Sequence, residues 1–174
     1  MRQSRAMDFQ SLYEKYAPSV RRFALFLSGD PTLADDITSD TFVRVWLAHG
    51  RIRELTVKSY LFTIARNAYR DQLRRGWRRA PLDEERLDTR ISVHAHLEQK
   101  QELASVLAAL QELPEIDRAA LLMRALDDMP YEEIADALQI TVTTAKVKLH
   151  RARVKLMEVR NPAIEKLSGS GEKL

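Results

Sequence analysis

Residues 131–153, YEEIADALQITVTTAKVKLHRAR, predict two short helices joined by a tight turn. In the first half, apolar residues recur three and four positions apart, as on one face of a helix; they are Tyr131, Ile134, Ala135 and Leu138. The same spacing in the second half gives a second apolar face; its members are Val142, Ala145, Leu149, Ala152 and Leu156. The turn between the helices is 139–141, where Thr141 can cap the second helix.

The second of these helices is basic outside its apolar face, whereas the first is acidic. The basic positions are Lys146, Lys148, His150, Arg151, Arg153 and Lys155. This layout is typical of a DNA-binding helix-turn-helix, whose second helix enters the major groove. A helical hairpin with a solvated basic face is the alternative. Small residues at the helix crossing, Ala135 and Ala145, and the abrupt change of charge favour DNA binding.

Charge is strongly segregated along the chain, although the net charge is only +3. Residues 51–79 hold nine Lys or Arg against two acids, a net of +7. Residues 101–140 hold two Arg against nine acids, a net of −7, and residues 141–160 hold six against one, a net of +5. Solvated helix faces would mix the two signs. Two separate basic blocks therefore indicate two nucleic-acid contacts.

Several function classes lack support in the sequence. The chain has no Cys, which excludes disulfides and thiolate metal sites and fits a reducing cytoplasm. It shows no apolar run long enough to span a membrane and no signal-peptide core, so we expect no membrane insertion. No phosphate-binding loop or catalytic motif occurs, and His94 and His96 are interpreted as surface residues. We therefore expect no enzyme activity, cofactor or metal.

Three helices are predicted in the N-terminal part, at 8–28, 31–48 and from 57 to about 75. Gly29-Asp30-Pro31 separates the first two, with Asp30 as the N-cap and Pro31 at the first helical position. Pro18 lies inside the first helix and predicts that it ends or kinks there.

The second of these helices has an exposed acidic side next to an aromatic pair. The polar positions are Asp35, Asp36, Ser39 and Asp40. Spacing alone favours a core location for Phe42 and Trp46. An acidic face beside two aromatic residues can also be a protein-docking surface.

The third helix combines cations with aromatic rings. The positions expected to face inward are Val57, Tyr60, Leu61, Ile64, Ala65, Ala68 and Leu73. Those expected to face outward are Lys58, Phe62, Thr63, Arg66, Asn67, Arg70, Arg74 and Arg75. Cations can neutralise phosphates and flat rings can stack on unpaired bases, so this face is suited to single-stranded nucleic acid.

The rest of the chain predicts a second group of helices. Residues 80–96 lose the helical periodicity and are interpreted as a linker. Helices resume from residue 97, with breaks at Pro114 and at 127–130, and residues 160–174 form a flexible tail. We therefore predict an all-α protein of two small helical domains, 8–79 and 97–159.

Three motifs together resemble a known family. They are LADDITSDTFVRVW at 33–46, SYLFTIARNAYRDQLRR at 59–75, and the stretch from LAALQELPEIDR to HRARVKL at 107–156. Their order and spacing are similar to those of extracytoplasmic-function (ECF) sigma factors, the small two-domain members of the sigma-70 family. The resemblance covers residues from about 9 to 157.

For the first domain, the resemblance implies a region 2 that binds core RNA polymerase and the promoter −10 element. Docking on the clamp of the polymerase's largest subunit would involve Asp35, Asp36, Ser39, Asp40, Phe42 and Trp46. Capture of the opened −10 strand would involve Arg51, Arg53, Lys58, Phe62, Arg66, Asn67, Arg70 and Arg74.

For the second domain, the resemblance implies a region 4 that reads the −35 element and contacts the flap of the second-largest polymerase subunit. The start of the second helix of the helix-turn-helix would meet base edges, through Thr143, Thr144, Lys146 and Val147. Phosphate contacts would come from Lys148, Arg151 and Arg153. The resemblance also implies an anti-sigma factor as a partner and a linker threaded towards the polymerase active-site cleft.

The chain departs from the family pattern at four places. Ser39 stands where Gln is frequent, Tyr60 where Trp is frequent, and Gln139 at a turn position often held by Gly. A Gln in that conformation costs about 1 kcal/mol. The segment 142–145, VTTA, differs from the usual start of the recognition helix, so no base preference can be transferred.

The sequence thus predicts a sigma factor that directs core polymerase to promoters and assists their opening. Two alternatives remain. A stand-alone helix-turn-helix regulator would bind DNA without core polymerase, but it leaves residues 31–79 without a purpose. A protein-binding adaptor would keep the fold without its basic faces, which are intact here.

Overall fold

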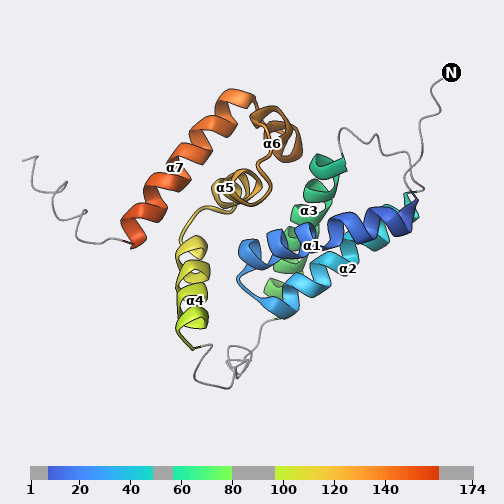
Figure 1. Ribbon diagram of the computed structural model, residues 1–174, viewed down its shortest axis with the longest axis horizontal. Helices are drawn as coiled ribbons and strands as arrows, with labels where there is room; N and C mark the ends of the chain where they lie inside the picture. Colours follow the sequence, from blue (N-terminus) through green and yellow to red (C-terminus); the bar gives the residue numbers. More distant parts are fainter. Residues whose placement is uncertain (1–7, 49–56, 80–96, 161–174) are drawn as a thin grey trace, which may run out of the picture.

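Seven helices make up the described part of the chain, which comprises residues 8–48, 57–79 and 97–160 of a computed structural model (Figure 1). Their bounds are α1 Phe9–Ser28, α2 Pro31–Leu47, α3 Val57–Arg79, α4 Leu97–Gln111, α5 Glu115–Asp127, α6 Tyr131–Leu138 and α7 Val142–Arg160. These residues contain no strand, so the predicted all-α class is confirmed. None of the seven helices is both long and apolar enough to cross a membrane.

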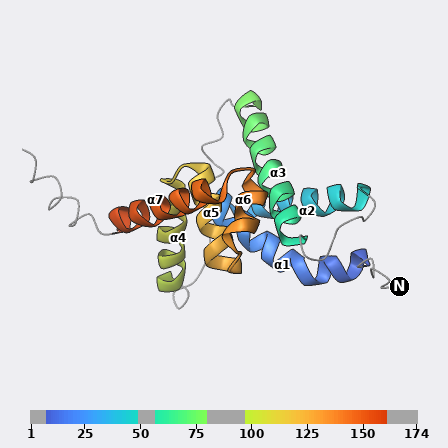
Figure 2. The same ribbon diagram turned by 90° about the horizontal axis from the view of Figure 1, so that it is seen from above.

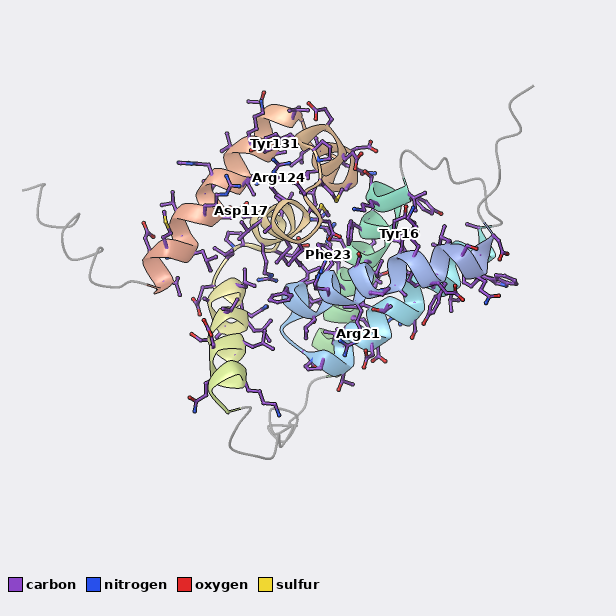
Figure 3. All side chains as sticks on the ribbon, viewed as in Figure 1. Tyr16, Arg21, Phe23, Asp117, Arg124 and Tyr131 are labelled. Carbon is purple, nitrogen blue, oxygen red and sulfur yellow. The ribbon has the colours of Figure 1, made fainter. Side chains whose placement is uncertain are left out.

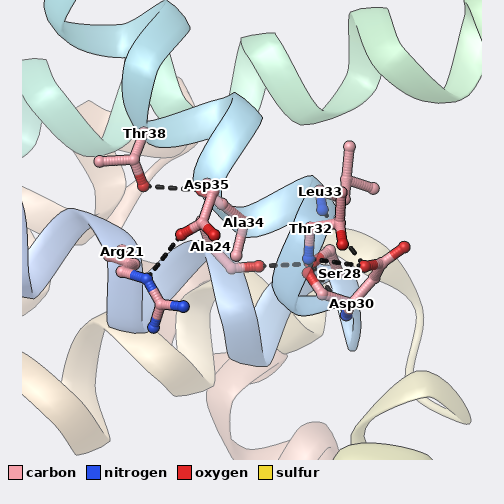
Figure 4. A network of polar contacts seen from close by, with 9 residues as sticks. All are labelled: Arg21, Ala24, Ser28, Asp30, Thr32, Leu33, Ala34, Asp35 and Thr38. Carbon is pink, nitrogen blue, oxygen red and sulfur yellow. Dashed lines mark hydrogen bonds and ion pairs between the residues drawn. The ribbon is translucent and has the colours of Figure 1, made fainter. Parts of the chain in front are cut away.

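The junction between α1 and α2 has the predicted chemistry. Gly29 adopts a left-handed conformation with φ 72° and ends α1. The Asp30 carboxylate accepts hydrogen bonds from the backbone N–H groups of Thr32 at 2.9 Å and Leu33 at 3.2 Å (Figure 4). Pro31 occupies the first helical position, where a missing N–H costs nothing. The sharp reversal between the two helices is therefore encoded locally.

Two helices differ from what the sequence indicated, α1 in its continuity and α3 in its length. Helix α1 continues through Pro18, so the expectation that the helix could end at this residue is wrong. Pro18 is exposed, so water can bond the carbonyl that the missing N–H leaves free. Helix α3 continues past the predicted end near residue 75 to Arg79.

The helix-turn-helix forms as predicted. Gln139 ends α6 in the left-handed conformation expected of that position, with φ 54° and ψ 47°. The Thr141 hydroxyl accepts a hydrogen bond from the Thr144 N–H at 3.1 Å and so caps α7. Ala145 is fully buried and Ala135 nearly so, as a close crossing of α6 and α7 requires.

Helices α1, α2 and α3 pack together around an aromatic pair. Phe23 of α1 and Phe62 of α3 are both buried, with ring centroids 4.7 Å apart. The prediction that Phe62 faces outward is therefore wrong. Leu73 was expected inside, yet it is 40% exposed because it lies in the last turns of α3, where that helix extends beyond its neighbours.

Helix α5 lies between the N-terminal helices α1–α3 and helix α7, in both views of the chain (Figures 1 and 2). It is buried at seven consecutive positions, 117–123, and packs against α1 as well as α4, α6 and α7. The buried Arg118 donates to the carbonyls of Leu110 at 3.2 Å and Leu113 at 3.1 Å, which secures the end of α4. The apolar side chains of both halves of the chain form one continuous core.

Replacing Gln139 by Gly is expected to stabilise the protein by about 0.5–1 kcal/mol, because Gly adopts the left-handed conformation without steric cost. Gln139 is exposed, so little packing is lost. Urea unfolding checks the change, with Gln139→Ala as the control that keeps a Cβ at the strained position. Equal stability gains for Gly and Ala would show that backbone strain is not the cause.

Candidate functional site

The outer face of α2 presents the predicted acidic group. Asp35, Asp36 and Ser39 are exposed, and Asp40 is half-buried. Asp35 accepts a hydrogen bond from Arg21 of α1 at 2.7 Å (Figure 4). Asp40 lies 3.6 Å from Arg44. The first pair is exposed and the second is partly exposed, so both contribute little to stability and these carboxylates can exchange their partners.

The aromatic pair of α2 divides between core and surface. Phe42 is buried, as its spacing predicted, whereas Trp46 is 59% exposed and contradicts that prediction. The Trp46 ring packs edge-on against Phe9 of α1 at 4.8 Å, and Tyr13 packs likewise against Phe42 at 4.8 Å. Because α2 projects past the core here, Trp46 has only one side covered.

An apolar patch therefore adjoins the acidic face. Its exposed members are Tyr13, Val43, Trp46 and Leu47. Next to it, a shallow groove between α1 and α2 is lined by residues that include Tyr13, Ala17, Asp35, Thr38 and Ser39. The sequence analysis did not predict that α1 contributes to this patch. The spacing of Phe9 and Tyr13, four positions apart, does place both rings on one side of a helix.

Helix α3 carries most of the predicted strand-binding residues. Asn67, Arg70 and Arg74 are exposed, while Lys58 is half-buried. Arg51 and Arg53 lie outside the described residues, as do His94 and His96.

Asp71 restrains the basic end of α3. It bonds Arg44 of α2 at 3.0 Å and also pairs with Arg74. The hydrogen bond from Arg44 holds the pKa of Asp71 below its usual value, although burial opposes the shift and Arg74 adds to it. The Arg74 side chain nevertheless remains 75% exposed.

Arg66 is engaged inside the molecule. Its Nε and Nη2 donate to the two carboxylate oxygens of Glu115 at 2.7 and 2.9 Å, and its side chain is only 11% exposed. Such a two-point pair is strong and fixes the guanidinium plane. Glu115 begins α5, so the pair joins the two halves of the chain. No local pattern in the sequence points to it.

The first turns of α7 are open to solvent. Thr143 and Lys146 are exposed, Val147 is 50% exposed, and Thr144 is partly covered because it takes part in the cap. The Lys146 ammonium lies 5.4 Å from the centre of the Tyr131 ring, and the Arg124 guanidinium lies at the same distance. Figure 3 labels Arg124 and Tyr131 near this end of the helix.

The three phosphate-contact candidates of α7 differ in accessibility. Arg153 is exposed. Lys148 lies 3.4 Å from the buried Asp117 and is 20% exposed, so it is turned inward, contrary to expectation. Arg151 lies 3.9 Å from the same carboxylate but keeps 63% of its side chain exposed. The solvent-facing cations of this set are therefore Arg151 and Arg153.

Asp127 is the least satisfied acid of the described residues. Its side chain is 3% exposed, and its Oδ2 has no hydrogen-bond partner among them. Oδ1 lies 3.5 Å from Arg22 of α1. Burial raises the pKa of Asp127, and the attraction of Arg22 and Lys58 only partly opposes this. Its position at the C-terminal end of α5 also disfavours a negative charge.

Two family models match the chain, one in each half. The model described as Sigma-70 region 2 matches residues 12–79, and the model described as Sigma-70, region 4 matches residues 103–156. The first spans most of α1 to α3, and the second contains the helix-turn-helix.

Individual relatives agree with the family models. The ECF RNA polymerase sigma factor SigM of Bacillus subtilis is 28% identical over 91% of this chain and 98% of its own. EcfG of Rhodopseudomonas palustris is 32% identical over 80% of this chain and 77% of its own. CarQ of Myxococcus xanthus, an RNA polymerase sigma factor, is 30% identical over 87% of this chain and 88% of its own.

Solved structures show the same fold. The sigma factor RpoE of Bartonella quintana, crystallised with the anti-sigma factor NepR, superposes with a TM-score of 0.70 at 26% identity, covering 88% of this chain and 97% of its own. CnrH, in complex with the cytosolic domain of CnrY, superposes with a TM-score of 0.69 at 24% identity and covers 88% of each chain.

Replacing Asp127 by Asn is expected to raise the melting temperature at pH 7 by about 2–4 °C, because a buried, poorly paired charge is removed. Because its pKa is raised in the folded state, Asp127 contributes fully to the free energy of unfolding only below the pKa of an unfolded Asp, near 3.9. This contribution is lost as pH rises through the pKa of the folded state. The advantage of Asn should therefore shrink towards pH 4.

Thermal unfolding from pH 7 to pH 4 measures this trend. The neighbouring Asp128, whose side chain is 90% exposed, supplies the control Asp128→Asn. An Asp127→Asn variant that is no more stable than the native protein at pH 7 would contradict the assignment.

Proposed function

The chain belongs to the sigma-70 family, in its ECF group, and from that membership we propose that it directs core RNA polymerase to specific promoters and assists promoter opening. One observation carries the proposal: a single chain combines region 2 and region 4 in the family order. Sigma factors initiate transcription without catalysing a reaction themselves. The polymerase supplies the chemistry, so the chain is not an enzyme and needs no cofactor.

Core polymerase would dock on the exposed face of α2. This face joins the carboxylates of Asp35, Asp36 and Asp40 to an apolar patch around Trp46. Exposed aromatic residues next to charged ones are favourable for protein association, because the rings bury area and the charges fix orientation. Ser39 lies between these acids and would be covered in the same contact, whereas Phe42 supports the patch from below.

The opened −10 strand would bind along the basic side of α3. Lys58, Asn67, Arg70 and Arg74 offer cations and hydrogen-bond donors there. Arg66 would join them once it leaves Glu115. Because Phe62 is buried against Phe23, its ring supports the helix and a base would have to stack elsewhere.

The −35 duplex would be read by the first turns of α7. Thr143, Thr144, Lys146 and Val147 are at the end of the helix that enters the major groove in helix-turn-helix proteins. Arg151 and Arg153 lie one to two turns further along and would bind phosphates, which give affinity without sequence information.

The remaining assignments follow from family membership. The region 2 domain would comprise residues 8–79 and the region 4 domain 97–159, joined by the linker 80–96. The chain would act with polymerase in the bacterial cytoplasm, contacting the clamp of the largest subunit and the flap of the second-largest. An anti-sigma factor would regulate it, since the RpoE structure contains one.

Run-off transcription with core polymerase on a promoter library tests the proposal as a whole. A sigma factor yields transcripts only with core polymerase and from a subset of promoters. A stand-alone regulator would bind a palindromic site without polymerase and would leave the α2 face unused.

Replacing Lys146 by Ala is expected to change −35 preference, with a loss of about 1–3 kcal/mol on the preferred duplex relative to scrambled DNA. Arg151→Ala should instead weaken binding to both duplexes similarly. Binding titrations of the holoenzyme at fixed salt separate the two. Equal losses on preferred and scrambled DNA for the Lys146 variant would show that Lys146 does not read bases.

Reversing charge at Asp36 and Asp40 together, to Lys, is expected to block holoenzyme assembly, because the acidic face would become repulsive to its partner. Co-purification with core polymerase measures this. The control reverses two exposed acids of the other half, Glu102→Lys with Glu112→Lys, and has the same net charge. Retention of the Asp36 and Asp40 variant on polymerase would exclude this docking face.

A further inference from the structure

Tyr131, the first residue of α6, has a cation from each of two other helices close to its ring. The Arg124 guanidinium of α5 and the Lys146 ammonium of α7 each lie 5.4 Å from the centre of the ring. A cation at this distance is attracted to the negative face of an aromatic ring. One aromatic side chain therefore connects the end of α5 with the first turns of α7.

The position of the Tyr131 ring is fixed from the side of α5. The ring is partly buried and packs against the core. Pro130, whose own ring restricts its backbone, directly precedes it with φ −59°. Arg124 donates to the Met129 carbonyl at 3.1 Å and lies 3.3 Å from the Asp128 carboxylate, so the loop that leads to Tyr131 is secured to α5.

Lys146, by contrast, is an exposed side chain on a flexible stem. A lysine loses much rotamer entropy when its ammonium is held in one place. Contact with a fixed ring restricts Lys146 before any DNA arrives. The ammonium has three N–H donors, and a ring face covers only one side of it, so donors remain available for a further partner.

The two cations at the ring carry like charges and repel each other. Their approach to one ring therefore needs a compensating attraction. The face of the Tyr131 ring supplies part of it, and the Asp128 carboxylate beside Arg124 reduces the repulsion. Without the ring, Lys146 would lose an attraction and keep the repulsion from Arg124, so its ammonium would leave this position.

We propose that Tyr131 is a positioning residue for promoter reading, whose ring holds the Lys146 ammonium ready to read one base pair of the −35 element. Tyr131 acts through Lys146 and need not touch DNA itself. An ammonium only donates hydrogen bonds, so the pair that Lys146 reads must present acceptors in the major groove, as guanine does with N7 and O6. This inference rests on the proposed function, since it takes α7 as the −35 reader.

Holding the ammonium in place affects specificity more than affinity. A lysine that moves freely can bind phosphates, which attract it whatever the sequence. A lysine held at one position meets the same base edge in every complex. Removing the ring should therefore weaken the preference for one base pair and leave binding to other sequences nearly unchanged.

The test measures binding of holoenzyme, assembled from the full chain and core polymerase, to promoter duplexes that each differ at one −35 base pair. Lys146→Ala identifies the pair that depends on Lys146. Tyr131→Leu keeps an apolar side chain against the core and removes the ring, and should lower the preference at the same pair by about 2- to 5-fold. Tyr131→Phe keeps the ring and should retain the preference.

Two comparisons separate positioning from a general loss of structure. Combining Tyr131→Leu with Lys146→Ala should weaken the preference no further than Lys146→Ala alone, because the ring acts through that lysine. Lys155→Ala removes another exposed lysine of α7 and should leave the pattern of preferences unchanged. A uniform loss over all −35 duplexes for Tyr131→Leu, or the same loss for Tyr131→Phe, would overturn the positioning role.

Nuclear magnetic resonance of the free chain tests the contact without relying on a destabilised variant. The ε-methylene protons of Lys146, assigned by comparison with Lys146→Arg, should be shifted upfield by the Tyr131 ring, and Tyr131→Phe should keep this shift. An unshifted signal in the native chain would overturn the positioning role alone. Absence of any promoter preference for the native holoenzyme would instead overturn the proposed function, and the positioning role with it.

Discussion

The burial of α5 is the constraint on which the rest of the structure depends. Seven consecutive residues of this short helix, 117–123, are buried, so it needs neighbours on every side. Helices α4, α6 and α7 cover part of its surface, and α1 covers another part. A helix enclosed in this way cannot be satisfied by the C-terminal helices alone. The single core that runs through both halves follows from this requirement.

The sequence predicted those features that are determined within a few residues. The Asp30 and Thr141 caps depend on side chains next to the backbone groups they serve, whereas the left-handed Gln139 was expected from the family pattern. Phe62 was misassigned because its burial depends on Phe23 of α1, and Trp46 because only Phe9 of α1 packs against its ring. Helical spacing gives a residue's direction around its own axis, and it contains no information about where a neighbouring helix ends.

The charge blocks of the sequence indicated the basic surface but not its partner within the chain. The basic block at 51–79 was interpreted as a nucleic-acid contact, and the acidic block at 101–140 was assigned no partner. The structure pairs one with the other through Arg66 and Glu115, which are 49 positions apart. No local rule connects residues so distant in the sequence. An unassigned block of opposite charge was nevertheless a signal that the basic face has an internal ligand.

Asp117 pairs in a comparable way with α7, the second helix of the helix-turn-helix. It is buried in α5 and draws Lys148 inward, while Arg151 remains mostly in solvent at 3.9 Å. This pairing lies within the C-terminal half, whereas the pair of Arg66 with Glu115 joins the two halves. Lys148 therefore fixes α7 on α5, and the first turn of α7 is positioned by that anchor. Acids of α5 thus pair with basic residues of two different helices, Asp117 with Lys148 of α7 and Glu115 with Arg66 of α3.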